Sequence, residues 1–318
     1  MAYRRSALVT GGAGFIGSHL VDRLVDDGYR VIIVDDLKTG KLKNLNHEAT
    51  FHHLSITNPT LLDVFKRESP DLVFHLAAQS SVPKSVQDPI LDNEVNVLGT
   101  LRLLEVSRRT GVHKIIFSST GGALYGDPEE VPCPDDARVE PISPYGMSKY
   151  MAEQYLDYYG RQHRLNYTTL RYGNVYGPRQ DPHGEAGVVA IFILAMLTGH
   201  RPRIFGDGNQ ARDFVSVDDV VEANMAAIHR GHRQSFNIAS GELTSVNELF
   251  GMLRDITGYR WEADHGPTRT GDVYRISLDC TRAQEELGWV ARTPLAEGLA
   301  RTVQYVRESA AAEGVLQG

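Results

Sequence analysis

The first 36 residues carry a strand, a glycine-rich turn, a helix and a second strand that ends in two acids. Residues 6–10 are a short apolar strand pattern, and residues 11–17, Gly-Gly-Ala-Gly-Phe-Ile-Gly, follow directly. The next ten residues place apolar side chains at helical spacing, and residues 30–34 form a second strand pattern before Asp35 and its neighbour. This order predicts a βαβ unit, which commits the chain to a parallel sheet covered by helices.

The glycines of the turn predict a dinucleotide site. Gly11, Gly14 and Gly17 satisfy G-x-x-G-x-x-G, and Gly12 in place of Gly11 gives the related G-x-G-x-x-G. Without side chains, the backbone approaches a pyrophosphate closely at the helix N-terminus, where unpaired N–H groups converge. Asp35 follows Gly17 by 35 − 17 = 18 residues, where a carboxylate accepts hydrogen bonds from the adenosine ribose.

The acid after the second strand also bears on the choice of dinucleotide. An acid at position 35 favours NAD over NADP, because it would repel the 2′-phosphate of NADP. Lys38 and Lys41 lie nearby and act against this preference. A glycine turn alone also occurs without a ligand, but here strand, helix and acid are in register, which favours NAD binding.

Strand and helix patterns alternate as far as residue 171 and less regularly beyond about Gly177. This predicts an α/β fold with a Rossmann-type, doubly wound parallel sheet. We expect an NAD-binding domain over residues 1–177 that carries the catalytic residues. A smaller α/β domain over residues 178–318 is expected to bind the substrate and to return some chain to the first domain. Further strands are expected at 50–54, 72–76, 114–117, 167–171, 203–205 and 235–238, and further helices at 59–68 (N-cap Asn58), 88–110, 145–164, 187–198, 218–230, 245–256 and 294–312.

Charge and composition argue against several classes of protein. The 33 lysines and arginines against 40 acids give a net charge of −7, which does not favour broad binding to nucleic acid or to an anionic membrane. No apolar run approaches the roughly 18 residues of a membrane helix. Cys133 and Cys280 cannot form a disulfide framework, so we expect a cytoplasmic protein. No metal site is predicted.

Tyr145 and Lys149 are four residues apart in a predicted helix and so lie on one face, one turn from each other. A phenol with a pKa near about 10 is a poor base at neutral pH, but a neighbouring ammonium favours the phenolate. The pair could therefore accept a proton from an alcohol, although the same spacing occurs by chance on many helices. Loops that follow parallel strands share one edge of the sheet, so one cleft should collect those at Gly11, Asp35, Ala77, Ser118 and Tyr172.

Short motifs occur in order along the chain, at residues 10–17, 75–78, 96–100, 118–120, 145–149, 170–178 and 212–215. With these motifs the chain resembles the extended short-chain dehydrogenase/reductase family, and within it the NAD-dependent nucleotide-sugar epimerases. The resemblance covers nearly the whole chain. Each motif alone is modest evidence, whereas their order and spacing together are specific.

The resemblance implies a UDP-sugar 4-epimerase that interconverts UDP-glucose and UDP-galactose through a 4-keto intermediate, with the N-acetyl sugars as a further option. Tyr145 would take the proton of the sugar 4-hydroxyl while hydride leaves C4 for the nicotinamide. Lys149 would hold the nicotinamide ribose and, with the positive nicotinamide, lower the pKa of Tyr145. Thr120 would bond the same hydroxyl. Ser119 is the alternative, because the segment before Tyr125 has one residue more than the usual pattern.

The resemblance also implies the binding residues. NAD contacts would come from Gly11, Gly14, Phe15, Ile16, Gly17, Asp35, Asp36, Leu76, Ala77, Ala78, Asn96, Ser118, Tyr145, Lys149 and Tyr172. UDP-sugar contacts would come from Thr120, Tyr145, Asn174, Val189, Phe205, Arg212, Arg269 and Asp272. Of these, Asn174, Arg212 and Arg269 would hold the phosphates, while Val189 and Phe205 would line the uridine. Family members dimerise through helices corresponding to 88–110 and 145–164, so a homodimer is expected.

Other readings of the scaffold remain open. A dTDP-glucose 4,6-dehydratase carries Asp-Glu after the catalytic hydroxyl, where this chain has Gly121-Gly122, so elimination lacks its acid. A UDP-glucuronate epimerase or decarboxylase is a second alternative. A non-catalytic NAD-sensing protein is the remote one, since the catalytic residues are intact. Ser55 stands where the family usually has an adenine-binding Asp. Ile276 is expected at the position that selects the sugar.

Overall fold

The computed structural model describes residues 5–182, 187–268 and 273–315, and its largest element is a sheet of seven parallel strands. The strands are β1 (Ser6–Thr10), β2 (Arg30–Asp35), β3 (Thr50–His53), β4 (Leu72–His75), β5 (Lys114–Thr120), β6 (Tyr167–Tyr172) and β11 (Gln234–Ile238). They lie in the order β11-β6-β5-β4-β1-β2-β3, all neighbours parallel. Strands are added in one direction from β1 to β3 and in the opposite direction from β4 onward, so the strand order reverses between β1 and β4. This confirms the predicted Rossmann-type, doubly wound sheet.

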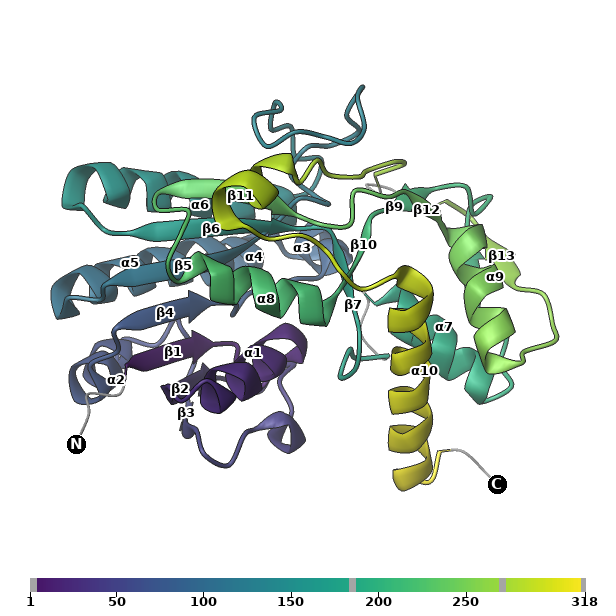
Figure 1. Cartoon of the computed structure of the whole chain (residues 1–318), viewed down its shortest axis with the longest axis horizontal. Helices are drawn as coiled ribbons and strands as arrows, with labels where there is room; N and C mark the ends of the chain where they lie inside the picture. Colours follow the sequence, from purple (N-terminus) through teal and green to yellow (C-terminus); the bar gives the residue numbers. More distant parts are fainter. Residues whose placement is uncertain (1–4, 183–186, 269–272, 316–318) are drawn as a thin grey trace.

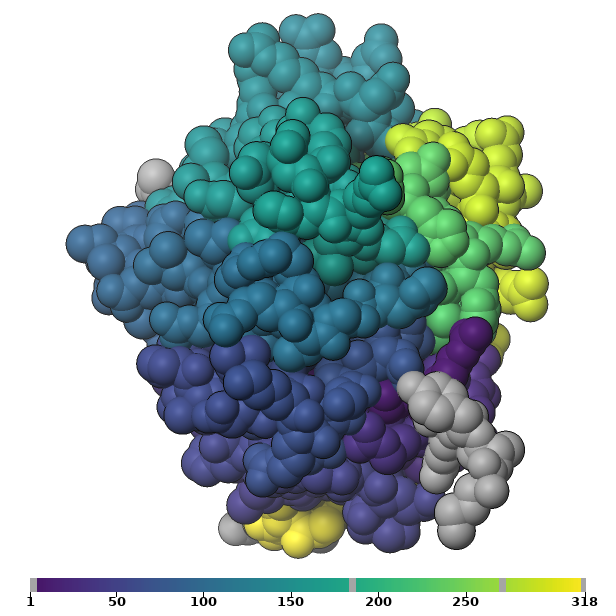
Figure 2. Space-filling view, turned by 90° about the vertical axis from the view of Figure 1, so that its left-hand side faces the viewer, coloured from purple at the N-terminus to yellow at the C-terminus, as the bar shows by residue number. Residues whose placement is uncertain are grey.

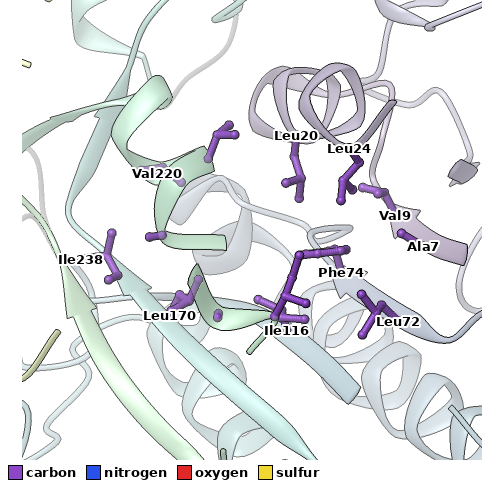
Figure 3. Packing of buried hydrophobic residues seen from close by; sticks show 14 of the residues in the cluster. Ala7, Val9, Leu20, Leu24, Leu72, Phe74, Ile116, Leu170, Val220 and Ile238 are labelled. Carbon is purple, nitrogen blue, oxygen red and sulfur yellow. The ribbon is translucent and has the colours of Figure 1, made fainter. Parts of the chain in front are cut away.

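Helices cover both faces of this sheet (Figure 1). Helices α1 (Phe15–Asp26) and α8 (Val217–Ala227) cover one face, and α2 (Leu61–Glu68), α5 (Gly99–Thr110) and α6 (Pro144–His163) cover the other. Figure 3 shows Leu20 and Leu24 of α1 near Val9 and Phe74 of the sheet, and Val220 of α8 on the side of Leu170 and Ile238. Side chains of β1 alternate between the two cores, as the two-residue period of a strand requires.

The helix expected over residues 88–110 is present from Pro89 to Thr110, but a π-helical turn lies within it. The structure has α3 (Val82–Gln87), α4 (Pro89–Asn93), a π-helical turn (Glu94–Leu98) and then α5, which ends at Gly111 with φ 76°. Proline at the first position of α4 has no N–H to continue α3, and the Asp88 side chain caps α4 by accepting the Leu91 N–H. The π turn then widens the helix where Val95 lines a cleft.

The predicted start of α2 is also wrong. Asn58 is not its N-cap, because its side chain accepts the N–H and the hydroxyl of Thr60 and forms a local turn instead. The helix begins after Thr60, at Leu61. A third difference concerns β5, which extends to Thr120, three residues beyond the expected strand. Its last three residues, 118–120, all carry hydroxyl groups.

The remaining elements form a second, smaller cluster at the right of Figure 1. Its helices are α7 (Val188–Leu197), α9 (Val246–Thr257) and α10 (Leu295–Ala312), which share one apolar core. The short strand pairs are β7 (Asn174–Tyr176) with β10 (Phe214–Ser216), β8 (Arg203–Phe205) with β13 (Asp264–Gly266), and β9 (Ala211–Arg212) with β12 (Thr244–Ser245). A 3-10 turn (Leu42–Asn44) and a second π turn (Ala283–Leu287) complete the chain.

Seen from the sheet-and-helix end in Figure 2, the purple to teal part of the chain forms most of the surface. The segment between β5 and α6 projects at the top of both views. Within the described residues, no helix combines the length and apolarity needed to cross a membrane.

Candidate functional site

A cleft of about 720 Å³ opens at the carboxyl ends of the sheet strands and extends under the smaller cluster. Parallel sheets place their ligands at this edge. The structure brings most of the predicted residues to its lining. These are Gly11, Gly14, Phe15, Ile16, Gly17, Asp35, Asp36, Leu76, Ala77, Ala78, Ser118, Thr120, Tyr145, Lys149, Tyr172, Asn174, Phe205 and Arg212.

Three expected contacts do not line the cleft. Val189 is buried in the core of the smaller cluster, and its neighbour Val188 on α7 takes the lining position. Ile276 is buried with Leu124 and Cys133, so it does not stand at a sugar pocket. Asn96 is 2% exposed and lies behind the loop that follows β4. Predicted contacts at 269 and 272 fall outside the described residues.

The glycine turn has the shape of a phosphate cradle. Gly11 has φ +73°, and a Cβ there would lie 2.8 Å from the backbone nitrogen of Ala77. A Cβ on Gly17 would overlap the carbonyl oxygen of Gly11. Helix α1 starts at Gly14 without a side-chain cap, so its N–H groups are available to an anion. The cradle therefore fits a dinucleotide pyrophosphate.

Asp35 is held in place to receive a ribose. One of its carboxylate oxygens accepts the Ala13 N–H at 3.0 Å, and the other accepts the Leu37 N–H at 2.8 Å. Burial raises the pKa of Asp35, and these two hydrogen bonds act to lower it. Each oxygen retains a further lone pair, so the side chain can still accept bonds from ribose hydroxyls.

The N-terminus of α6 positions the catalytic pair. Ser143 caps the helix by accepting the Gly146 N–H, and Pro144 occupies the first turn. Tyr145 follows at once, and the Thr120 side chain is close enough to act on the pKa of its phenol. Lys149, one turn further, donates to the Ser118 carbonyl oxygen at 2.6 Å. The spacing predicted from the sequence is thus realised at the end of β5.

Of the two hydroxyls left open by the sequence, only Thr120 faces Tyr145. Ser119 donates to the buried carboxylate of Glu153, because successive residues of β5 point to opposite sides of the sheet. Glu153 in turn forms an ion pair with Arg171. The geometry therefore favours Thr120 as the hydroxyl beside the phenol.

The pKa of Tyr145 is raised, whereas the sequence predicts that Lys149 lowers it. Burial raises the pKa of Tyr145, Asp92 raises it further, and the Thr120 side chain only partly opposes them. Burial lowers the pKa of Lys149 to about 8, while Glu153 and Asp92 act to raise it. Desolvation of the phenolate and the Asp92 carboxylate therefore both favour the protonated phenol. A further positive charge in the cleft is needed to favour the phenolate.

A directed chain of hydrogen bonds fixes the end of β4. Thr100 donates to the Asn96 carbonyl oxygen at 2.6 Å, so its oxygen accepts from His75 Nε2 at 3.0 Å. His75 Nδ1 then accepts from Thr10 at 2.8 Å, and Thr10 accepts the Ala77 N–H at 3.2 Å. The imidazole is fully buried, and burial lowers its pKa to about 3. It is therefore a neutral structural side chain.

This histidine predicts a pH dependence of stability. Its folded pKa of about 3 lies below the ordinary 6.5, so below pH 6.5 only the unfolded chain takes up the proton. Stability is full above pH 6.5 and falls toward pH 3, by about 1.4 kcal/mol per pH unit. Between pH 6.5 and 5, urea titrations should show the wild type losing about 2 kcal/mol more than His75→Gln. Equal losses would contradict the buried neutral imidazole.

Several cleft residues were not found from the sequence. Arg179 has φ 66° and pairs with Asp22 of α1 at 2.7 Å. Lys41 pairs with Asp181 at 3.1 Å. Lys41, Arg179 and Asp181 line the cleft. The signal was present in the Arg-Gln-Asp run directly after the Gly177-Pro178 motif. Within the described part of the chain, no cluster of His, Cys, Asp and Glu could hold a metal.

A doubly wound sheet with a glycine-rich turn, an acid at the end of β2 and a Tyr-x-x-x-Lys turn beside a threonine defines an enzyme of the short-chain dehydrogenase/reductase class. More narrowly, the chain belongs to the NAD dependent epimerase/dehydratase family, whose model matches residues 7–239. NAD is accordingly its cofactor, which the cradle and Asp35 fit.

Similar proteins agree with this assignment. The UDP-glucose 4-epimerase of Mycolicibacterium smegmatis is 46% identical, over 94% of this chain and 98% of its own. The structure of the UDP-glucose 4-epimerase of Thermotoga maritima with UDP-glucose has a TM-score of 0.95 at 52% identity, covering 96% of this chain and 99% of that one. The Thermus thermophilus UDP-glucose 4-epimerase complex with NAD has a TM-score of 0.91 at 41% identity, covering 95% and 99%.

Proposed function

We propose that this protein is a UDP-glucose 4-epimerase that interconverts UDP-glucose and UDP-galactose through a transient 4-keto intermediate. The observation that carries the proposal is the contact between Tyr145 and Thr120 in a cleft that also contains the dinucleotide cradle. Similarity to enzymes of that name over nearly the whole chain supports the same activity.

The chain's own residues supply binding and proton transfer. NAD, when bound, accepts a hydride from C4 of the sugar and returns it. The Thr120 side chain lies beside the phenol of Tyr145 and acts to lower its pKa. Tyr145 takes the hydroxyl proton as C4 is oxidised and gives it back as C4 is reduced. Lys149, fixed by Ser118, holds the ribose side of the cofactor site.

The smaller cluster grips the nucleotide and leaves room for the sugar to turn. Asn174 of β7 pairs with Phe214 of β10, and Arg212 of β9 lies two residues before Phe214. Both Asn174 and Arg212 line the cleft. Arg212 donates to the carbonyl oxygens of Ala211 and Tyr274, at 3.0 and 3.3 Å, which orients its guanidinium. We assign both side chains to the diphosphate and Phe205 to the uridine. Gly122 has no side chain, so it leaves space in the cleft for the sugar to turn.

The segment after Thr120 argues against elimination chemistry. A Cβ on Gly122 would meet only the Asn174 side-chain oxygen, at 3.4 Å, so this wall is open. A Cβ on Gly121 would overlap Leu278, so a carboxylate could not stand there without moving that side chain. A 4,6-dehydratase needs an acid at this place, and the chain offers none. Epimerisation requires no such acid.

The proposed activity is tested by incubating the purified protein, without added cofactor, with UDP-glucose, UDP-galactose, UDP-GlcNAc and UDP-glucuronate, and resolving the products. We expect 4-epimers of the first two, and the response to the other two defines the substrate range. A 4-keto-6-deoxy or decarboxylated sugar as the stable product would overturn the proposal.

We also propose a cytoplasmic homodimer. Both cysteines are free, which suits a reducing compartment. Large apolar side chains are exposed on α3 to α6, among them Ile90 at 72%, Leu98 at 58% and Met151 at 40%. These are the helices through which the family dimerises, and apolar side chains on packed neighbouring helices favour an interface.

The interface gives a prediction for sedimentation. The wild type should sediment as a dimer at micromolar concentration, and Leu98→Glu/Met151→Glu as a monomer, because two like charges would be buried without a counter-ion. Trp261→Lys removes an equally exposed apolar side chain (52%) on the smaller cluster and should leave the dimer intact. A monomeric wild type would contradict the assignment.

A further inference from the structure

Asp92 is a buried carboxylate with no role so far. It lies on α4 and is 0% exposed. One of its oxygens accepts from Gln79 Nε2 at 2.7 Å and from Asn96 Nδ2 at 3.2 Å. Its other oxygen is buried and, within the described residues, has no hydrogen-bond partner. A buried carboxylate oxygen without a donor lowers the stability of the fold, so this arrangement suggests a functional reason for Asp92.

The cluster around Asp92 is joined to the catalytic turn. Asn96 Nδ2 also donates to Ser148 Oγ at 3.1 Å, and Ser148 donates to the Tyr145 carbonyl oxygen at 3.0 Å. Ser85 of α3 accepts the Tyr145 N–H at 3.1 Å. Helices α3 and α4 and the π turn therefore hold the first turn of α6 from behind. Asp92 and Asn96 are four residues apart on the same helical face, so both point toward this turn.

Few charges share this interior with Asp92. Helix α6 contributes Tyr145, Lys149 and Glu153, and Glu153 is already paired with Arg171 of β6. Strand β4 contributes the neutral His75. The loop after β4 contributes Gln79, which is uncharged. Asp92 is therefore a buried acid that is joined to the first turn of α6 through Asn96 and Ser148, and it acts to raise the pKa of both Tyr145 and Lys149.

We propose that Asp92 is a positioning residue that sets the protonation of the Tyr145–Lys149 pair from behind. A fixed negative charge keeps Lys149 protonated in its buried position and makes the proton on Tyr145 harder to remove. Tyr145 must also return its proton to the 4-keto sugar, so a raised pKa of Tyr145 is as necessary as a protonated Lys149. The proposal rests on the proposed function for its use in the reaction, whereas the charge coupling is a property of the chain alone.

The test is Asp92→Asn, with Asp92→Ser as a second neutral variant of different shape in case the first does not fold. Loss of the negative charge lowers both pKa values, so both limbs of the pH profile of kcat/KM should move to lower pH, by about one unit. Asp92→Glu, which keeps the charge, should restore the wild-type limbs. Asp88→Ser removes a charge from the exposed start of the same helix while keeping a capping hydroxyl, and should leave the profile unchanged.

A second readout does not depend on the reaction. In protein stripped of cofactor, the Lys149 ammonium can be titrated by nitrogen NMR and assigned with Lys149→Met. Its pKa should fall below about 8 in the neutral Asp92 variants. A Lys149 titration that is unchanged in both neutral variants would overturn the proposal whatever the substrate proves to be. A lower rate with unmoved limbs would also overturn it, because that is the signature of a purely structural residue.

Discussion

Tyr145→Phe should lower kcat by about 10³-fold or more while UDP-sugar affinity stays within a few fold of the wild type. The phenol oxygen is the group that exchanges the proton with the sugar hydroxyl, and the ring that packs in the cleft is kept. Isothermal titration with UDP and a coupled assay for product separate the two effects. Turnover that survives this change would show that another group is the base.

Two hydroxyl variants serve as the matched controls for Tyr145→Phe. Thr120→Val removes the hydroxyl beside the phenol and should also lower kcat strongly. Ser119→Ala removes a hydroxyl one residue away that donates to Glu153, and should leave kcat largely intact. The reverse order of effects would return Ser119 to the catalytic position.

Glu153→Ala should destabilise the fold by about 3–5 kcal/mol, because it leaves the buried Arg171 guanidinium without its counter-ion. The pair is almost fully buried, with side chains 4% and 9% exposed and a closest N–O distance of 2.7 Å. Arg171 also donates to the Tyr125 hydroxyl at 2.8 Å, so the network ties β6 to the segment after β5. For a chain of this size, the melting temperature should fall by about 4–8 °C.

The control for the buried pair is an exposed one. Arg108 and Glu105 form an ion pair one turn apart on the surface of α5. Arg108→Ala should leave the melting temperature unchanged within error, because water screens an exposed pair. If the Glu153 variant melted where the Arg108 variant does, the buried ion pair would not be a main support of this part of the fold.

Local chemistry made the cradle and the catalytic turn predictable from the sequence. Gly11 and Gly17 occupy positions where a Cβ would meet backbone atoms, so the residue type itself reports the turn. Tyr145 and Lys149 report a helix by their spacing, and Ser143 with Pro144 marks its start. In each case the cause lies within a few residues of the effect.

The misplaced residues depend on packing between distant segments. Asn96 and Val189 were both assigned to ligands from the family resemblance, yet Asn96 lies in the π turn and Val189 in the core of the smaller cluster. A π turn breaks the 3.6-residue period that would have located Asn96. Strands β7 and β10, of three residues each, are too short to show a period at all.

The central claim, reversible oxidation at C4, is tested most directly with UDP-glucose that carries deuterium on C4. The protein, without added cofactor, is incubated with this substrate in ordinary water, and the UDP-galactose formed is examined by NMR and mass spectrometry. Because the hydride removed from C4 is returned to the same carbon, the product should retain the deuterium at C4. Loss of the label to solvent, or a stable keto product in place of the 4-epimer, would contradict the account.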